Sequence, residues 1–511
     1  MKIKKALKRV LLVLTTLIVI IGILAAVFLG IKPAVQTKKL SSLSMDDSPL
    51  AEYASLIPDN DEIYSWATDL VDMGARLPGT KAGTRAQNYV KEKFEEFGLE
   101  DVSIIPSKST LYTCDDWSLS VDGTEMESFY IGYSNNDGTC HETNTNANAE
   151  LVYVGDDIGN TDVRGKIVVA DISFSSIPYA AIKAVADLYY DPDGTLSLTD
   201  SQDIPYVTDN FYDIFFEAQN AGAAGFIGIL TDYIDSCEYH NENYSYINDY
   251  DMSLPGLWVS NQTGETIKSM ISGAETPVTA NLKMNSSLTE IEAGAVVGFV
   301  RGTSEETIMV QSHYDSITAG GVEDASGCSA MMAMAKFWSQ MPQENIGKTI
   351  LFIATDTHFS DYDTHDSVLA EYYGEDCNIV GNLCVEHIAN QVTVNEDGSC
   401  ELSGDVEPRI VFVSGGDKLV QITNEEIVRH GMKKTIVLPA SILGDELFTD
   451  ADEFYQEGTP VVNLISGPVY LYDTIDTADK IAKDQLNPTA YTMSDILARL
   501  MNLSAEELKG E

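Results

Sequence analysis

The stretch TIMVQSHYDS (307–316) decides the fold, because an uncharged run rich in strand-forming residues ends directly in a histidine and an aspartate. The same pattern recurs in TILFIATDT (349–357) and NLCVEHIA (382–389). Each apolar run is long enough for one buried strand, and a helical pattern occupies 326–338. Strands that alternate with helices predict an α/β domain with a mostly parallel sheet covered by helices on both faces.

The charge balance limits the kinds of partner that the chain can bind. The 511 residues include 31 Lys and Arg against 79 Asp and Glu, a formal net charge of −48. Such a surface repels phosphate backbones, so the composition excludes nucleic-acid binding. The length also exceeds what a single hydrophobic core usually supports, so we expect more than one domain.

The first 57 residues predict a membrane anchor and a tether. Residues 10–31 carry no charge and follow a basic cluster in the first nine residues. At about 1.5 Å per residue this run spans a hydrocarbon core of about 30 Å, whereas a cleaved signal peptide usually has a shorter apolar stretch. We expect an uncleaved transmembrane helix within 1–34, a tether over 35–57, and the rest exported. The predicted location is the cell membrane, single-pass, with an extracellular catalytic domain.

Polar residues follow the apolar runs where strands of the expected sheet end. Because functional sites in open α/β sheets gather at the carboxyl ends of strands, we expect these side chains to lie close together. Histidine and carboxylate are the ligands that zinc and similar divalent ions prefer. With 79 acidic residues a carboxylate near one strand end is uninformative, but the chain has only 7 histidines. The candidate residues are His313, Asp315, Asp324, His358, Glu386, His387 and Asp473.

Three segments, in the same order, resemble the co-catalytic zinc exopeptidases, the family of bacterial leucyl aminopeptidases, glutamate carboxypeptidase and glutaminyl cyclase. The first is GARLPGT (74–80), and the second is VQSHYDSITAGGVEDASGCSAMMAMA (310–335). The third is FYQEGTPVVNLISGP (454–468) with YDTIDTADKI (472–481). The resemblance implies a metal-dependent exopeptidase that binds one or two zinc ions and acts on peptides.

The resemblance also implies roles for individual residues. His313 and Asp324 match the first metal-binding histidine and the bridging aspartate, and Asp315 matches the aspartate that orients that histidine. Glu386 and Asp473 stand in the places of two further ligands. The consecutive glutamates that supply the family's general base and a second-metal ligand are replaced here by His358 and Phe359. We therefore expect His358 to act as a metal ligand or as the substitute base, with Asp356 and Asp361 as the other candidates for the base.

An inserted segment divides the predicted peptidase domain. GKIVVAD (165–171), GAAGFIGI (222–229) and LPGLWVS (254–260) resemble a protease-associated domain. We expect this β-rich insertion over 146–285, between peptidase parts at 58–145 and 286–505, with no strand of 150–285 in the main sheet.

Three functions remain open from the sequence. The first is a membrane-anchored extracellular metallopeptidase of the aminopeptidase kind. The loss of the paired glutamates favours a second, a catalytically impaired relative that binds peptides at the cell surface. A third is another reaction on the same metal scaffold, such as amide cyclisation or deacylation. The sequence leaves the oligomeric state open.

Overall fold

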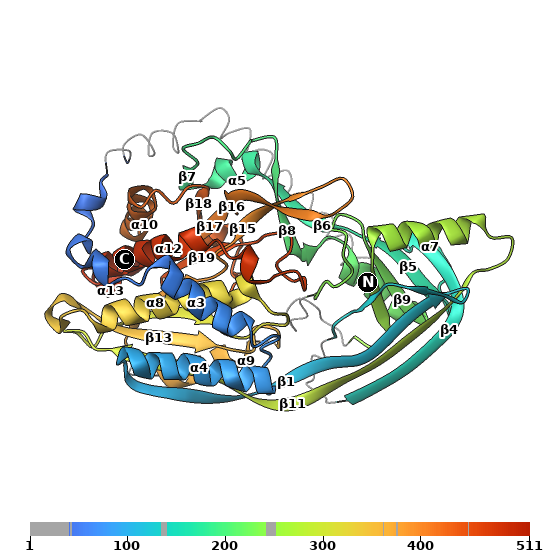
Figure 1. Cartoon of the computed structure of the whole chain (residues 1–511), viewed down its shortest axis with the longest axis horizontal. Helices are drawn as coiled ribbons and strands as arrows, with labels where there is room; N and C mark the ends of the chain where they lie inside the picture. The colour runs from blue at the N-terminus through green and yellow to red at the C-terminus, as the bar shows by residue number, and fades with distance from the viewer. Residues whose placement is uncertain are drawn as a thin grey trace.

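The computed structural model describes residues 40, 43–133, 141–241, 252–360, 362–374, 377–447 and 449–510. It shows an α/β body and a second lobe, joined by two long strands that run along one side of the molecule (Figure 1). The apolar run 10–31 lies outside the described residues. Within the described ranges, no helix combines the length and the apolar character needed to cross a bilayer.

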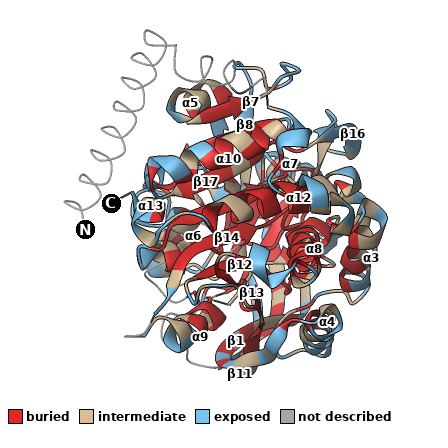
Figure 2. Cartoon of the chain, turned by 90° about the vertical axis from the view of Figure 1, so that its left-hand side faces the viewer, coloured by how far each residue is buried: buried red, intermediate tan, exposed pale blue. Residues whose placement is uncertain are grey.

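The centre of the body is a parallel sheet. Its strands β13 (Thr349–Thr355), β12 (Thr307–His313), β14 (Ile379–Val385) and β19 (Val461–Ser466) lie side by side in this order and run parallel. Their residues are almost all buried, as Figure 2 shows for β12, β13 and β14, which explains the unbroken apolar runs of the sequence. The predicted mixed α/β fold with a mostly parallel central sheet is confirmed.

Helices cover both faces of this sheet. On one face, Ile308 and Val310 of β12 share a core with α8 (Gly327–Ser339), α12 (Lys483–Leu500), α3 (Asn60–Val71) and α4 (Lys81–Phe97). On the other face, Met309 packs with residues of α9 (Asp363–Tyr372) and α11 (Asp452–Gln456). Successive β12 residues thus enter opposite cores, as the alternation of strand side chains requires.

Two long strands connect the body to the second lobe. The sequence suggests short strands at 102–105 and 118–121, but these belong to one strand, β1 (Glu100–Val121), paired antiparallel with β11 (Thr279–Val300). One end of β11 pairs with β13 of the body and the other with β4 (His141–Gly155) of the second lobe. The expected domain boundaries at 145 and 285 fall inside β4 and β11, so each strand continues across its boundary.

The second lobe continues the sheet with parallel strands β4, β5 (Ile167–Ile172), β9 (Gly225–Leu230) and β10 (Gly256–Ser260). It also contains helices α6 (Phe211–Ala221) and α7 (Asn261–Gly273), so it is an α/β lobe rather than a purely β-rich one. Its protease-associated character stays a prediction.

An arm of the second lobe returns to the body. The arm consists of β6 (Phe174–Pro178), α5 (Tyr179–Val185), β7 (Leu188–Tyr190) and β8 (Ser201–Thr208), and β6 pairs with β8. Strand β7 pairs antiparallel with β18 (Thr435–Pro439) at the edge of the main sheet. The expectation that 150–285 gives no strand to the main sheet is therefore wrong.

Candidate metal centre

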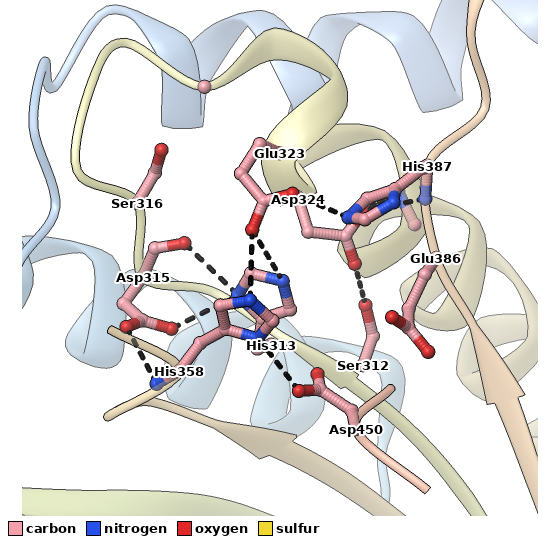
Figure 3. Close-up of polar contacts among 12 residues, drawn as sticks. Ser312, His313, Asp315, Ser316, Glu323, Asp324, His358, Glu386, His387 and Asp450 are labelled. Atoms are coloured by element: carbon pink, nitrogen blue, oxygen red, sulfur yellow. Dashed lines mark hydrogen bonds and ion pairs between the residues drawn. The ribbon is translucent and has the colours of Figure 1, made fainter. Parts of the chain in front are cut away.

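Three histidine side chains converge on the carboxylate of Glu323 (Figure 3). Nε2 of His313 lies 3.3 Å and Nε2 of His358 lies 3.5 Å from Glu323 Oε1, and Nε2 of His387 lies 2.5 Å from Oε2. His313 ends β12, His358 follows β13 and His387 follows β14. Neighbouring parallel strands thus deliver the three imidazoles to one edge of the sheet.

Each imidazole is oriented through its other ring nitrogen. An acceptor close to Nδ1 places the proton of the neutral ring on that nitrogen, so the Nε2 lone pair faces Glu323. Histidines that bind metal ions are usually held in this way. The Nδ1 partners are Asp315 Oδ1 for His313 (3.0 Å), Asp450 Oδ1 for His358 (2.8 Å) and the Ser466 carbonyl oxygen for His387 (2.9 Å).

Glu323 is held in place by the loop between β12 and α8. Its backbone N–H donates to Asp476 Oδ2 at 2.9 Å. Arg76, from the GARLPGT segment, is completely buried and donates to carbonyl oxygens of the loop. These acceptors are Tyr314 (2.8 Å), Ala319, Gly320 (3.0 Å) and Glu323 itself (3.4 Å). The role of the GARLPGT segment is therefore to fix the loop that carries Glu323.

The charges in the cluster compensate one another. Burial favours the neutral form of Glu323, but His387 and His358 outweigh it and hold the pKa of this carboxyl well below its usual range. Burial also opposes protonation of His387, yet Glu323 raises the pKa of this imidazole to about 9. Without a metal ion, imidazolium groups supply the positive charge that the buried carboxylate requires. A divalent cation would supply the same charge.

The donor atoms fit a divalent ion. Nε2 of His313, Nε2 of His387 and both carboxylate oxygens of Glu323 are buried and make no hydrogen bond. Ligand atoms of His313, Glu323 and His358 lie within 4.8 Å of one another. Leaving such groups unsatisfied is costly, whereas imidazole nitrogen and carboxylate oxygen are the usual ligands of zinc.

The structure brings some of the predicted site residues together and not others. His313 and His358 lie in the cluster, and Asp315 orients His313. Asp324, expected to bridge two ions, instead accepts hydrogen bonds from Ser312 Oγ (2.6 Å) and from the backbone N–H groups of Gly327 and His387 (both 3.0 Å). The carboxylate that faces the histidines belongs to the preceding residue, Glu323.

Glu386 and Asp473 also have partners outside the cluster. Glu386 Oε1 accepts from Cys384 Sγ at 2.9 Å and from Asn463 Nδ2 at 2.6 Å. Asp473 accepts from the backbone N–H of Ile475 at 3.1 Å, and its carboxylate faces Ser236 and Tyr233 of the second lobe. The five expected ligands therefore do not all converge.

The sequence analysis assigned no ligand role to three residues of the centre: Glu323, His387 and Asp450. The first two are neighbours of the chosen candidates in Glu323-Asp324 and Glu386-His387. The sequence marks such a pair but does not say which member faces the site. Asp450 lies in TDAD (449–452), just before the resembling segment that begins at Phe454. The only sequence feature that marked Asp450 was an acidic side chain close to this segment.

The second lobe covers the segment between β19 and Asp473. Tyr470, Leu471 and Tyr472 belong to the hydrophobic core of that lobe. The His240 N–H donates to the Tyr472 carbonyl oxygen at 2.9 Å, and Tyr239 forms a bridge with Asp473. The Phe359 ring next to His358 contacts the Tyr472 ring at 5.7 Å between centroids. The side chains of the cluster are almost completely buried.

We expect Arg76→Lys to lower the free energy of unfolding by about 2–4 kcal/mol, because lysine cannot reach all the buried carbonyl oxygens that the guanidinium bonds. Chemical denaturation of the metal-free chain measures this effect. Arg85→Lys is the matched control, since Arg85 is exposed and donates only to the Met73 carbonyl oxygen in the described contacts. Equal losses in the two variants would contradict this role of Arg76.

A comparison with protein families matches residues 295–357 to the model described as peptidase family M28. This segment contains β12, β13 and the loop that carries Glu323. No curated protein sequence matches the chain significantly.

Solved structures of similar fold cover most of the chain. A peptidase M28 precursor from Shewanella amazonensis is 16% identical, with a TM-score of 0.63, and the match covers 87% of this chain and 96% of that one. A zinc aminopeptidase from Bacillus subtilis is 16% identical (TM-score 0.57; 89% and 99% covered). An aminopeptidase from Aneurinibacillus sp. strain AM-1 is 18% identical (TM-score 0.55; 87% and 94% covered). Together with the family match, these likenesses confirm the resemblance predicted from the sequence, and the donor cluster is that of a divalent-metal centre.

Proposed function

We propose that this chain, whose residues 295–357 match peptidase family M28, is a metal-dependent peptidase that removes residues from peptide ends, as an aminopeptidase does. The observation that carries the proposal is the convergence of His313, His358 and His387 on Glu323 at the carboxyl edge of the sheet. The similar structures, which include a zinc aminopeptidase, support the substrate class and the metal.

Different residues of the site have different roles in the proposed reaction. A bound divalent ion would polarise the scissile carbonyl and lower the pKa of a water molecule. His313 and His358 would hold this ion through Nε2 together with Glu323, while Asp315 and Asp450 keep the two rings in orientation. Glu323 offers two oxygens, so one can bind the ion while the other accepts the proton of the attacking water. His358, expected as the substitute base, faces Glu323 as a ligand would.

A specific observation favours a second candidate function. His358 stands where the resemblance implies the general base, and its ring lies between Asp450 and Glu323. Glu323 is held ionised by its neighbours and is therefore a weak base. A relative that retains the metal centre but binds peptides without cleaving them is consistent with this arrangement.

Peptide hydrolysis by the purified full-length chain distinguishes the two candidates. We expect release of amino acids from aminoacyl anilides and unblocked peptides in the presence of zinc, cobalt or manganese. N-acetylated peptides should not be cleaved, and a chelator or His313→Ala should abolish activity. Metal binding without hydrolysis of any peptide would leave the peptide-binding candidate, and absence of metal binding would refute both.

We further propose that residues 10–31 anchor the protein in the membrane and that the folded part lies outside the cell. The uncharged run and the basic residues before it support this proposal. Cell fractionation with and without residues 1–39 tests the anchor, and protease treatment of intact cells tests the side. Protection of the folded part in intact cells would contradict the extracellular location.

A further inference from the structure

We propose that a hard cation, Ca²⁺ or K⁺, binds beside the candidate metal centre, between the carboxylates of Glu386 and Asp450 and two amide side chains. The two amides belong to Gln311 of β12 and Asn463 of β19. The site is held by oxygen atoms alone, and the inference does not depend on hydrolysis of a peptide. Three of the four residues lie beyond residue 357, where the family match ends.

The strand register places these side chains on one face of the central sheet. Gln311, Cys384 of β14 and Asn463 are register partners on three neighbouring strands. Glu386 stands two residues after Cys384 and therefore projects from the same face. Cys384 Sγ and Asn463 Nδ2 both donate to Glu386 Oε1, at 2.9 Å and 2.6 Å. Gln311 Nε2 donates to the backbone carbonyl oxygen of Asp450 at 2.9 Å. The four side chains therefore gather around Cys384.

One oxygen atom of each of the four side chains is buried and, within the described residues, has no hydrogen-bond partner. These atoms are Oε1 of Gln311, Oε2 of Glu386, Oδ2 of Asp450 and Oδ1 of Asn463. None of the four residues is more than 1% exposed. The amide nitrogens of Gln311 and Asn463 are already used as donors, which identifies their oxygens as the atoms left over. Because unsatisfied buried acceptors are costly, these oxygens call for a ligand.

The chemistry of these atoms favours a hard cation over water or zinc. All four are acceptors, and two of them belong to carboxylates. Carboxylate and amide oxygens are the ligands of hard cations such as Ca²⁺ and K⁺, whereas structural zinc sites use nitrogen and sulfur. A water molecule can donate to two of these atoms, but its own oxygen adds a further acceptor to the cluster. A cation satisfies the acceptors without adding one.

The charge of the cluster also favours a cation. Asp450 Oδ1 pairs with His358 Nδ1 at 2.8 Å. The described contacts of Glu386 Oε1 come from a thiol and an amide, and neither carries a positive charge. Burial and, after it, the Asp450 carboxylate raise the pKa of Glu386 to about 7, while His387 lowers it in part. The two carboxylates thus repel each other, and a cation between them relieves that repulsion.

The ion would support the candidate metal centre through Asp450. Oδ1 of Asp450 orients the His358 ring, while Oδ2 is left for the proposed ion. Asp450 is in this sense a positioning residue, which couples an oxygen-ligated cation to an imidazole of the neighbouring centre.

The test is titration of the full chain, with zinc present, with Ca²⁺ and separately with K⁺ at constant ionic strength. An ion that binds the folded state raises Tm as its concentration increases. We expect a saturable rise for at least one of the two ions. No saturable rise with either ion would overturn the inference. Zinc content and peptide hydrolysis, measured on the same samples, report separately on the proposed function.

Matched variants locate the response, because a chain of net charge −48 also attracts cations to its surface. We expect Gln311→Met and Asn463→Leu each to weaken binding of the responding ion more than about 10-fold, since each removes an oxygen ligand. The control is Asn424→Leu in α10 (Asp417–Arg429). Asn424 is 3% exposed and its Oδ1 has no partner in the described residues, but α10 packs in the core that contains Leu464, on the other face of the sheet.

Circular dichroism verifies that each variant is folded. Unchanged binding in either cluster variant, or an equal loss in Asn424→Leu, would overturn the inference.

Discussion

Glu323→Gln should empty the metal centre, whereas Asp324→Asn, one residue away, should leave the ion in place. Glutamine keeps the size of Glu323 but removes the negative charge that faces all three imidazoles. We expect metal affinity to fall more than about 100-fold, beyond the cost of losing an outer partner, and hydrolysis to fall with it. Asp324 bonds Ser312, Gly327 and His387 N–H, so its change should lower the free energy of unfolding by about 1–3 kcal/mol.

Metal content by mass spectrometry and unfolding by chemical denaturation separate the two effects. The reverse pattern, with metal lost from Asp324→Asn and retained in Glu323→Gln, would restore the ligand assignment that the sequence suggested. Measuring both variants at saturating zinc and after dialysis distinguishes weakened binding from misfolding.

The sequence was sufficient for the central sheet because that sheet is built from unbroken apolar runs. The runs at 307–313, 349–355 and 461–466 are strands whose residues are all buried. Strand β7 was beyond prediction, since Leu188–Tyr190 lies in an acidic segment and is ordered by pairing with β18 far along the chain. The sequence predicts two short strands within residues 100–121, because polar residues interrupt the strand pattern. In the structure, pairing with β11 continues through those polar residues.

The candidate site could be located from the sequence but not fully resolved. Strand ends with histidines identified the edge of the sheet correctly, because parallel strands carry their carboxyl ends to one place. What the sequence could not determine was the direction of each side chain in Glu323-Asp324 and Glu386-His387. Successive side chains in extended backbone point to opposite sides, so a wrong choice by one residue exchanges a metal ligand for a structural carboxylate.

We expect Glu407→Gln to stabilise the protein increasingly as the pH rises from about 5 to 8. Glu407 is buried between the body and the arm, where Gln202 Nε2 donates to its Oε1 at 3.3 Å. Burial raises the pKa of this carboxyl to about 8, while Gln202 and Lys434 lower it and Asp203 raises it. The rings of Tyr179 and Tyr470 lie near the same carboxylate.

The sign of the effect follows from proton linkage. Between the unfolded pKa of about 4.3 and the folded value, the folded state binds the proton more tightly, so stability falls as the pH rises through this window. Glutamine still accepts from Gln202 but does not ionise. The free energy of unfolding of Glu407→Gln should therefore exceed that of the parent by about 3–5 kcal/mol near pH 8, and the difference should vanish near pH 4.5. Denaturation curves from pH 5 to 9 measure it, with exposed Glu401→Gln of β16 (Cys400–Val406) as the control. If the parent and Glu407→Gln curves run parallel over this range, the carboxyl ionises with an ordinary pKa. The charged carboxylate between the arm and the body would then carry no net desolvation penalty.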